Sequence, residues 1–332
     1  MWKTNQMMTI TDYHADTTHA SKSALDILAR SPYEYWCRKV FPQLKRADPF
    51  LADPVPQHVR QQWHEEEQGR HFVIGNAVDC LLLEPHDFGK RFFVTTHLNR
   101  STREGKAAHI ANVTANAGKQ WLKPDEHRDV VAMVQAINDS WISAFVNPST
   151  AQRTITWEDG DTGVKCKCRP DWLLTLDDAF WANFIEELQP EQNWLSWLLN
   201  ESMGLDANNQ PHGLANYDDL ACDLKTLNGR WESHVVDYRY HVQAPFYLDG
   251  INAAMNDGKR RAFIFITVDT AWPHSVHMRF LPPAAMRIGR AEYRRNLAQL
   301  AECRHSGEWP KGGDTFTETD MPSWFMFKNR NV

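Results

Sequence analysis

The sequence lacks the features that mark membrane-spanning and secreted proteins. No apolar run approaches the roughly 18 residues that a transmembrane helix needs. The N-terminal stretch contains no basic region followed by an apolar one, so we expect no secretory signal and a cytoplasmic location. The six cysteines form no CxxC pair and have no regular spacing, which argues against a disulfide framework or a zinc ribbon.

The composition is that of a chain that can bury a core. Hydrophobic residues make up 42% and charged residues 23% of the 332 residues, which differs from the composition of disordered chains. This length allows one large domain or two small ones. We expect a flexible segment over residues 1–20 and a single domain over residues 21–328.

The charge is unevenly distributed along the chain. The formal net charge is -6, from 36 Lys and Arg against 42 Asp and Glu, which argues weakly against a nucleic-acid partner. Residues 177–219, however, contain nine of these acids and no Lys or Arg, so the rest of the chain has 36 basic against 33 acidic residues. One acidic segment therefore masks a mildly basic remainder.

Periodicity predicts a mixed architecture. Apolar residues at helical spacing predict helices over 21–40 with a break at Pro32, 61–85, 125–146, 231–256 and 283–305. Alternating or continuous apolar runs predict strands within 154–178, 220–227, 261–269 and 274–281, the first group as a hairpin around a Gly-Asp-Thr-Gly turn. Residues 42–58 read as a connector and 101–118 as an exposed loop or weak helix. This order predicts a mixed sheet with helices against it, an α/β or α+β fold.

Asp171, Asp223 and Lys225 are the candidate catalytic residues in this pattern. Within CKCRPDWLL, a continuous strand would place Lys165, Lys167, Arg169 and Asp171 on one face, since side chains alternate with period two. Within CDLKT, Asp223 and Lys225 share a face in the same way. Carboxylate oxygens suit Mg²⁺, which also accepts waters and phosphate oxygens as ligands. A metal there would activate a water for attack on phosphorus, and Lys225 would orient the water or neutralise charge.

The alternative interpretation is that these are solvated strand residues near turns. A D-x-K triplet alone occurs often by chance. Both carboxylates are expected in the middle of strands beside apolar residues, where a charge without a role costs stability. This context favours a functional site.

The motifs resemble those of a known nuclease superfamily. R-P-D, then D-L-K-T, then H-V-Q-A-P-F-Y in the order of the chain resemble the PD-(D/E)xK nuclease superfamily, and more narrowly its RecE-type, exonuclease VIII-like branch. S-K-S-A-L with S-P-Y-E-Y, G-N-A-V-D-C-L-L-L-E-P and M-P-S-W extend the resemblance over about residues 20–325. It implies a restriction-endonuclease-like α/β fold with a helical N-terminal part.

The resemblance also implies roles for individual residues. Asp171 and Asp223 are similar to the two metal-binding acids, Lys225 to the motif lysine, and the carbonyl of Leu224 to a further metal ligand. Gln243 and Tyr247 match a Q-x-x-x-Y motif and, being four apart, lie on one helical face. Ordinary amphipathic helix surface is the alternative for that pair.

Two departures from the family pattern stand out. Asp79 occupies the position in G-N-A-V-D where the family usually has a metal-binding His. Asp is a competent Mg²⁺ ligand, so the site either survives with an extra charge or is impaired; His71, two turns earlier, is a candidate substitute or a simple exposed His. In addition, Asp171 and Asp223 lie 52 positions apart, because the acidic segment 177–219 is inserted between their strands. We expect it to form short helices and to serve either as a contact for another subunit or partner, or as a surface elaboration.

Weaker candidates concern substrate phosphates. Ser21, Lys22 and Ser23 at a helix N-terminus could bind a terminal phosphate, although plain N-capping is the alternative. Arg169 could contact the substrate backbone, and basic residues of 259–261 and 287–295 could bind phosphates or simply be solvated. Only Cys303 lies near the C-terminus, so the iron–sulfur cluster of some relatives is not expected.

The resemblance thus implies a Mg²⁺-dependent exonuclease, with Mn²⁺ as an alternative ion, that degrades double-stranded DNA ends from 5′ to 3′. It implies a single-strand annealing protein as partner, a ring-shaped homo-oligomer, and a phage or prophage recombination setting. Two other functions stay open. One is a single-strand-directed or endonucleolytic nuclease of a Cas4-like kind, and the other is a DNA-binding or assembly protein whose catalysis has decayed at Asp79.

Overall fold

A four-stranded mixed sheet forms the centre of the computed structural model, which describes residues 8–67, 69–95, 101–187 and 213–311. Its order is β5 (Trp172–Thr175), β6 (Asp219–Leu227), β7 (Arg261–Asp269) and β8 (Val276–Arg279). β6 runs antiparallel to β5 and parallel to β7, and β8 is antiparallel to β7. β6 and β7 are nearly buried throughout, because their apolar runs are covered on both faces.

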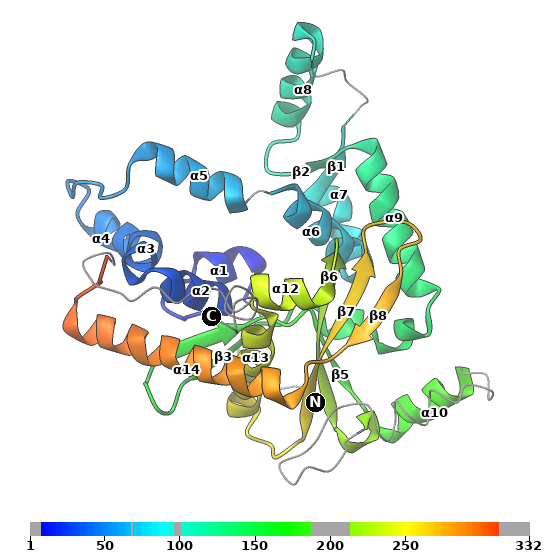
Figure 1. Cartoon of the computed structure of the whole chain (residues 1–332). Coiled ribbons are helices and arrows are strands. Elements are labelled where there is room, and N and C mark those ends of the chain that lie inside the picture. The colour runs from blue at the N-terminus through cyan, green and yellow to red at the C-terminus, as the bar shows by residue number, and fades with distance from the viewer. Residues whose placement is uncertain (1–7, 68, 96–100, 188–212, 312–332) are drawn as a thin grey trace, which may run out of the picture.

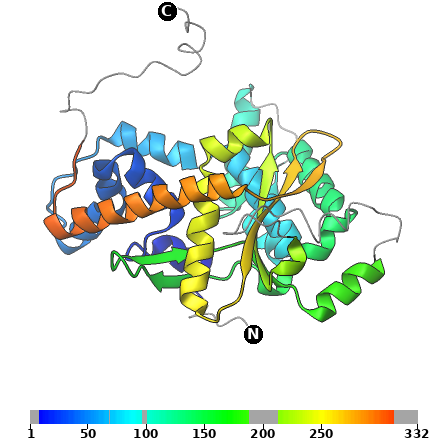
Figure 2. The ribbon, with the colours of Figure 1, turned by 60° about the horizontal axis from the view of Figure 1, so that its bottom comes forward.

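Helices cover both faces of this sheet (Figure 1). On one face α6 (Arg70–Leu83) and α9 (Pro124–Asn138) pack with side chains of all four strands into the largest apolar cluster. On the other face α13 (Tyr240–Met255) packs against β5, β6 and β7. α14 (Pro283–Ser306) lies across α13, as the turned view shows (Figure 2). The sheet is therefore the middle layer of the fold.

A second, two-stranded sheet lies beside the first. It is the hairpin of β3 (Ile155–Glu158) and β4 (Lys165–Cys168), joined to α2 (Lys22–Arg30), α13 and α14 by a separate apolar cluster. The other helices are α1 (Ile10–Ala15), α3 (Pro32–Tyr35), α4 (Phe41–Ala47), α5 (Gln57–Glu67), α7 (Phe88–Arg91), α8 (Arg103–Ala115), α10 (Asp178–Glu187) and α12 (Trp231–Asp237). Short 3-10 turns span Pro85–Asp87, Trp141–Phe145, Pro148–Thr150 and Leu214–Asn216, a π-helical turn spans Trp36–Val40, and β1 (Phe92–Val94) pairs in parallel with β2 (Gln120–Leu122).

Many predicted elements are confirmed, and the predicted restriction-endonuclease-like α/β class agrees with this mixed sheet between helices. The strand predicted over 261–269 has these bounds, and that predicted over 220–227 begins one residue earlier. The last helix ends before Gly307, whose φ of 75° suits a glycine. No described helix is long and apolar enough to cross a membrane.

Several predictions were wrong in detail. The helix predicted over 231–256 is two helices, because Arg239 adopts a left-handed conformation with φ of 53° and breaks the run. CKCRPDWLL is not one strand: β4 and β5 belong to different sheets, and Asp171 lies in the break between them, next to Pro170. Pro170 has no N–H for a strand ladder, which accounts for the interruption. The period-two argument for Lys165 to Asp171 therefore does not hold.

The expected loose N-terminus and acidic insertion are only partly described. Residues 10–15 form α1. The Lys167 ammonium, on the hairpin, donates hydrogen bonds to the backbone carbonyls of Tyr13 and Asp16, each at 2.5 Å. Residues 13–16 are thus in contact with the hairpin, and the flexible segment expected over residues 1–20 stays a prediction. α10 confirms a short helix in the insertion, whereas 188–212 lie outside the described residues. Of the exposed loop or weak helix expected over 101–118, the helix is found, as α8, and it projects from the body (Figure 1).

Candidate active site

Asp171 and Asp223 come together where β5 begins beside the middle of β6. Trp172 pairs with Cys222 in the antiparallel ladder, so Asp171 stands opposite Asp223, one position beyond the last pair. The Asp171 N–H donates to the Cys222 carbonyl at 3.0 Å, and its Oδ2 accepts from the Leu224 N–H at 2.7 Å. Directly opposed residues have Cβ atoms about 4.5–5.5 Å apart. Two acids separated by the long insertion thus become neighbours through strand pairing alone.

The Asp171 carboxylate is held by two donors and by its surroundings. Besides the Leu224 N–H, the Gln152 side-chain amide donates to Oδ1 at 3.0 Å. Burial, followed by the negative charge of Asp223, raises the pKa of Asp171 from 3.8 to about 7, although Lys225 and the two donors oppose the shift. The carboxyl thus takes up a proton near neutral pH unless a cation stabilises its charge.

Asp223 is buried under α13 and has two partners. The Gln243 amide donates to its Oδ2 at 2.5 Å, and the Lys225 ammonium forms an ion pair with it. Burial of Lys225 opposes its charge, but Asp223, followed by Tyr240 and Asp171, raises the pKa of Lys225 above its usual value. Lys225 therefore stays protonated, with Nζ 5.2 Å from the ring centroid of Tyr240. It can supply positive charge to a substrate but cannot act as a base.

Asp79 approaches the same carboxylates from α6. Burial, then Asp171, raises the pKa of Asp79 well above its usual value, with Asp223 adding to the shift and Lys225 opposing it. Its carboxylate has no hydrogen bond or ion pair within the described part of the chain. α6 lies close to β6 here, since a Cβ at Gly75 would stand 3.4 Å from Thr226 Oγ1. Asp79 is thus near the pair but not bound to it.

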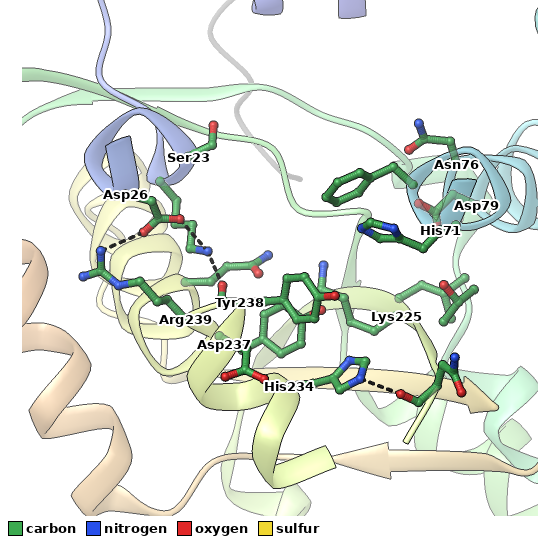
Figure 3. Close-up of a pocket in the computed structure, with 18 of the residues that line it drawn as sticks. Ser23, Asp26, His71, Asn76, Asp79, Lys225, His234, Asp237, Tyr238 and Arg239 are labelled. Atoms are coloured by element: carbon green, nitrogen blue, oxygen red, sulfur yellow. Dashed lines mark hydrogen bonds and ion pairs between the residues drawn. The ribbon is translucent and has the colours of Figure 1, made fainter. Parts of the chain in front are cut away.

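A cavity of about 1350 Å³ opens over Lys225 and Asp79 (Figure 3). Figure 3 shows His71, Asn76 and Asp79 on α6 along one side, with Ser23 and Asp26 on α2 along the other. Tyr238 and Arg239, at the break between α12 and α13, form part of its wall. The left-handed turn at Arg239 therefore shapes the cavity as well as interrupting the helix.

The donor set fits a divalent cation that is shared with a substrate and waters. Among the described residues, no group of three or more histidine, cysteine or acidic side chains could hold a metal ion by itself. Asp171 and Asp223 are nevertheless adjacent. Oδ1 of Asp223 is buried and forms an ion pair with Lys225, but it has no hydrogen bond within the described part of the chain. Mg²⁺ commonly binds one or two carboxylates plus waters and phosphate oxygens. The metal ligands that the fold brings together are therefore the carboxylates of Asp171 and Asp223. That Asp79 and the Leu224 carbonyl are further ligands stays a prediction.

The other predicted residues are distributed around this centre. Tyr247 on α13 is buried close enough to Asp223 to be affected by its charge. Burial, followed by Tyr13 and Asp223, raises the pKa of Tyr247 well above its usual value. Ser21 caps α2 by accepting from the Ala24 N–H at 3.3 Å, as the capping alternative predicts. Lys22 pairs with Asp26 at 2.8 Å and, like the exposed Ser23, lines the cavity. Their contact with a phosphate stays a prediction, and His71 is likewise exposed on the cavity wall.

Many of the basic residues proposed for phosphate binding form internal ion pairs instead. Arg261 pairs with Asp219 and Asp257, Arg290 with Asp249, and Arg294 with Asp159. These pairs join β7 and α14 to neighbouring elements. They fit a structural role better than a free phosphate-binding patch.

Gln152 is the residue near the site that sequence reasoning missed. Its backbone has φ of 52°, its N–H donates to the Asp171 carbonyl at 2.7 Å, and its side chain contacts the Asp171 carboxylate. The Arg169 Nε in turn donates to Gln152 Oε1 at 3.2 Å. Gln152 and Arg169 thus form a chain of contacts that orients Asp171. A loop glutamine has no sequence signature, and the contact of Arg169 with the substrate backbone stays a prediction.

Comparison with known proteins identifies the family. Residues 54–181 and 218–317 match the family described as a PDDEXK-like domain of unknown function (DUF3799). The chain belongs to this family. Residues 182–217 of this PDDEXK-like protein fall outside the match, in agreement with an insertion between the two acidic strands.

A solved structure supports the fold of this PDDEXK-like protein. A crystal structure from Eubacterium rectale, described as a "putative exonuclease", is similar with a TM-score of 0.51 at 10% sequence identity, and the match covers 99% of this chain and 100% of that one. No curated protein matches the sequence. At that identity the likeness concerns the fold and not the reaction.

Proposed function

We propose that this PDDEXK-like protein is a metal-dependent deoxyribonuclease that hydrolyses phosphodiester bonds. The observation that carries the proposal is the meeting of Asp171 and Asp223 beside a protonated Lys225, which lines a large cavity. Paired carboxylates with an adjacent cation suit a reaction in which negative charge builds up on phosphorus.

Each residue of the site has a part in this reaction. Asp171 and Asp223 would hold the divalent ion, Mg²⁺ or Mn²⁺, which supplies Lewis acidity and lowers the pKa of a water when it is bound. Lys225 offsets charge on the phosphoryl oxygens and is kept protonated by Asp223. Gln243 fixes the orientation of Asp223. Tyr247 lies on the same helical face, one turn further along α13.

We further propose an exonuclease that acts on double-stranded DNA ends, from 5′ to 3′. The support is the motif order that resembles the RecE-type branch, together with the description of the similar Eubacterium rectale protein as an exonuclease. A ring-shaped homo-oligomer, an annealing protein as partner and a role in phage recombination belong to the same proposal. So do a single nuclease domain over 21–328, a cytoplasmic location and the absence of an iron–sulfur cluster.

The test compares linear duplex DNA with covalently closed circular DNA, each incubated with the full-length protein and Mg²⁺. An exonuclease degrades only the linear form, and label at the 5′ end should be released before label at the 3′ end. Nicking of the circle would identify an endonuclease instead. No change in either DNA, with Lys225→Ala behaving like the wild type, would identify a binding protein and refute the nuclease.

A further inference from the structure

A second cavity reaches the candidate active site from the other side of Asp79. Its volume is about 960 Å³, and it is lined by the N-terminal segment at Met8–Ile10, the end of α6 and the loop at 149–154. Asn76 and Asp79 line both this cavity and the larger one. These two residues therefore stand at the junction of two compartments.

The site residues are divided between the compartments. Leu224, Lys225 and Gln243 line the larger cavity, whereas Asp171 and Gln152 line the smaller one. A phosphodiester bound between Asp171 and Lys225 would thus lie at the junction. The DNA chain continues from both ester oxygens of a phosphodiester. The DNA on one side of the scissile phosphate would therefore enter the larger cavity, and the DNA on the other side would enter the smaller one.

Two guanidinium groups give the smaller cavity a place for an anion. Arg153 donates to the Ser149 carbonyl at 3.1 Å, and Arg169 donates to the Met8 carbonyl at 3.0 Å and to Thr154 Oγ1 at 2.8 Å. All these acceptors are neutral oxygens. Lys90 and Arg91 in the same wall pair instead with Asp87 and Glu84. Among the residues that the structure describes, no carboxylate therefore pairs directly with the positive charges of Arg153 and Arg169.

We propose that the smaller cavity binds the nucleotide that is joined to the scissile phosphate on the side away from Lys225. After cleavage the same cavity holds this nucleotide as the nucleoside monophosphate product. Arg153 and Arg169 contact the phosphate of this nucleotide. The cavity volume falls within the range of about 300–1,000 Å³ found for small-molecule sites, which suits a single nucleotide better than a duplex. This inference rests on the proposed nuclease function.

The test uses thymidine 5′-monophosphate, which contains no phosphodiester bond and is not consumed. Its binding to the full-length protein is measured by calorimetry with Mg²⁺ present, for the wild type, Arg153→Ala and Arg153→Lys. We expect Arg153→Ala to weaken binding at least about tenfold, the usual effect of losing a hydrogen bond to a charged group, and Arg153→Lys to restore part of it. Thymidine, which lacks the phosphate, should bind weakly and equally to all three proteins.

Arg287→Ala is the matched control, because Arg287 is exposed on α14 and lines neither cavity. Unchanged nucleotide binding by Arg153→Ala, or equal weakening by Arg287→Ala, would overturn the proposal. If Arg153→Ala does not fold, Arg153→Gln, which removes the positive charge but keeps a polar side chain, takes its place with the same expectation. Cleavage of linear DNA by the wild type is measured in parallel. If the wild type does not cleave DNA, the proposed nuclease function is wrong. If it cleaves DNA but Arg153→Ala binds the nucleotide as well as the wild type does, only the proposal for the smaller cavity is wrong.

Discussion

Asp171 Oδ2 accepts a 2.7 Å hydrogen bond from the backbone N–H of Leu224, which ties the loop before β5 to the middle of β6. The contact places one acid beside the other although the chain makes a long excursion between them. Since it depends only on strand pairing and one carboxylate, the site does not need the insertion for its geometry. Predictions about the site can therefore be made from the residues around these two acids.

Removing the charge of the second acid or of the lysine should strongly lower the rate of hydrolysis. Asp223→Asn leaves Lys225 without its ion partner, and Lys225→Ala removes the positive charge from the lining of the larger cavity. We expect each to lower the cleavage rate of linear DNA at least about 10²-fold, the effect of losing one electrostatic contact to a transition state. Lys165→Ala, at an exposed lysine of the β3–β4 hairpin, is the control and should cleave like the wild type.

Asp171 should make the stability of the metal-free protein depend on pH. Its pKa of about 7 in the folded state lies above the usual 3.8, so the folded protein binds the proton more tightly than the unfolded chain. The contribution is fully present below the unfolded pKa and is lost as pH rises through 7. Thermal unfolding from pH 4 to 8 should therefore show a steeper loss of stability in the wild type than in Asp171→Asn. Added Mn²⁺ should reverse the loss in the wild type alone, and parallel curves for the two proteins would contradict the assignment.

Gln152 should set the affinity for the metal through Asp171. Gln152→Met keeps a side chain of similar length and removes the amide that donates to Oδ1. Because partners that orient a ligand commonly contribute 10–100-fold to affinity, we expect Mn²⁺ binding to weaken about tenfold. Electron paramagnetic resonance of Mn²⁺ with the protein and no DNA measures this directly. Affinity equal to that of the wild type would show that Gln152 only fills space.

Asp79 is the position where the chain departs from the family it resembles. If it supplies a further oxygen to the metal, Asp79→Ala should abolish Mg²⁺-dependent cleavage, and Asp79→His should restore part of it with a changed preference between Mg²⁺ and Mn²⁺. Cleavage rates in each ion provide the measurement. Near wild-type activity of Asp79→Ala would remove Asp79 from the site and leave the pair of acids as the protein's contribution.

The crossing of α13 and α14 should tolerate no added methyl group. A Cβ at Gly289 would stand 1.6 Å from the carbonyl oxygen of His241, two residues before Gln243. Gly289→Ala must therefore push the helices apart, and we expect a loss of about 1–3 kcal/mol in the free energy of unfolding. Urea denaturation measures it, with Gly160→Ala as control because nothing lies within 4 Å of its Cβ position. Equal stability of the two variants would contradict the close crossing.

The sequence allowed a correct prediction of β6 and β7 because their apolar runs are long and bounded by polar residues. It also placed Asp223 and Lys225 on one face, since period two holds within a real strand. For Asp171 the same argument was wrong, because Pro170 interrupts the strand, yet the acid still reaches the predicted neighbour. The prediction of a single helix over 231–256 was also wrong, because the left-handed backbone conformation of Arg239 cannot be detected from hydrophobic periodicity.

The sequence by itself determined which local elements form and which residue types could carry the chemistry, because periodicity and motif order are local properties. Only the tertiary structure decided which distant groups meet: Gln152 with Asp171, Gln243 with Asp223, and Asp79 at the junction of two cavities. Such meetings depend on strand register, on the packing of α6 and α13 and on one turn with positive φ. No short stretch of the chain contains that information, because each contact joins segments that only the folded core brings together.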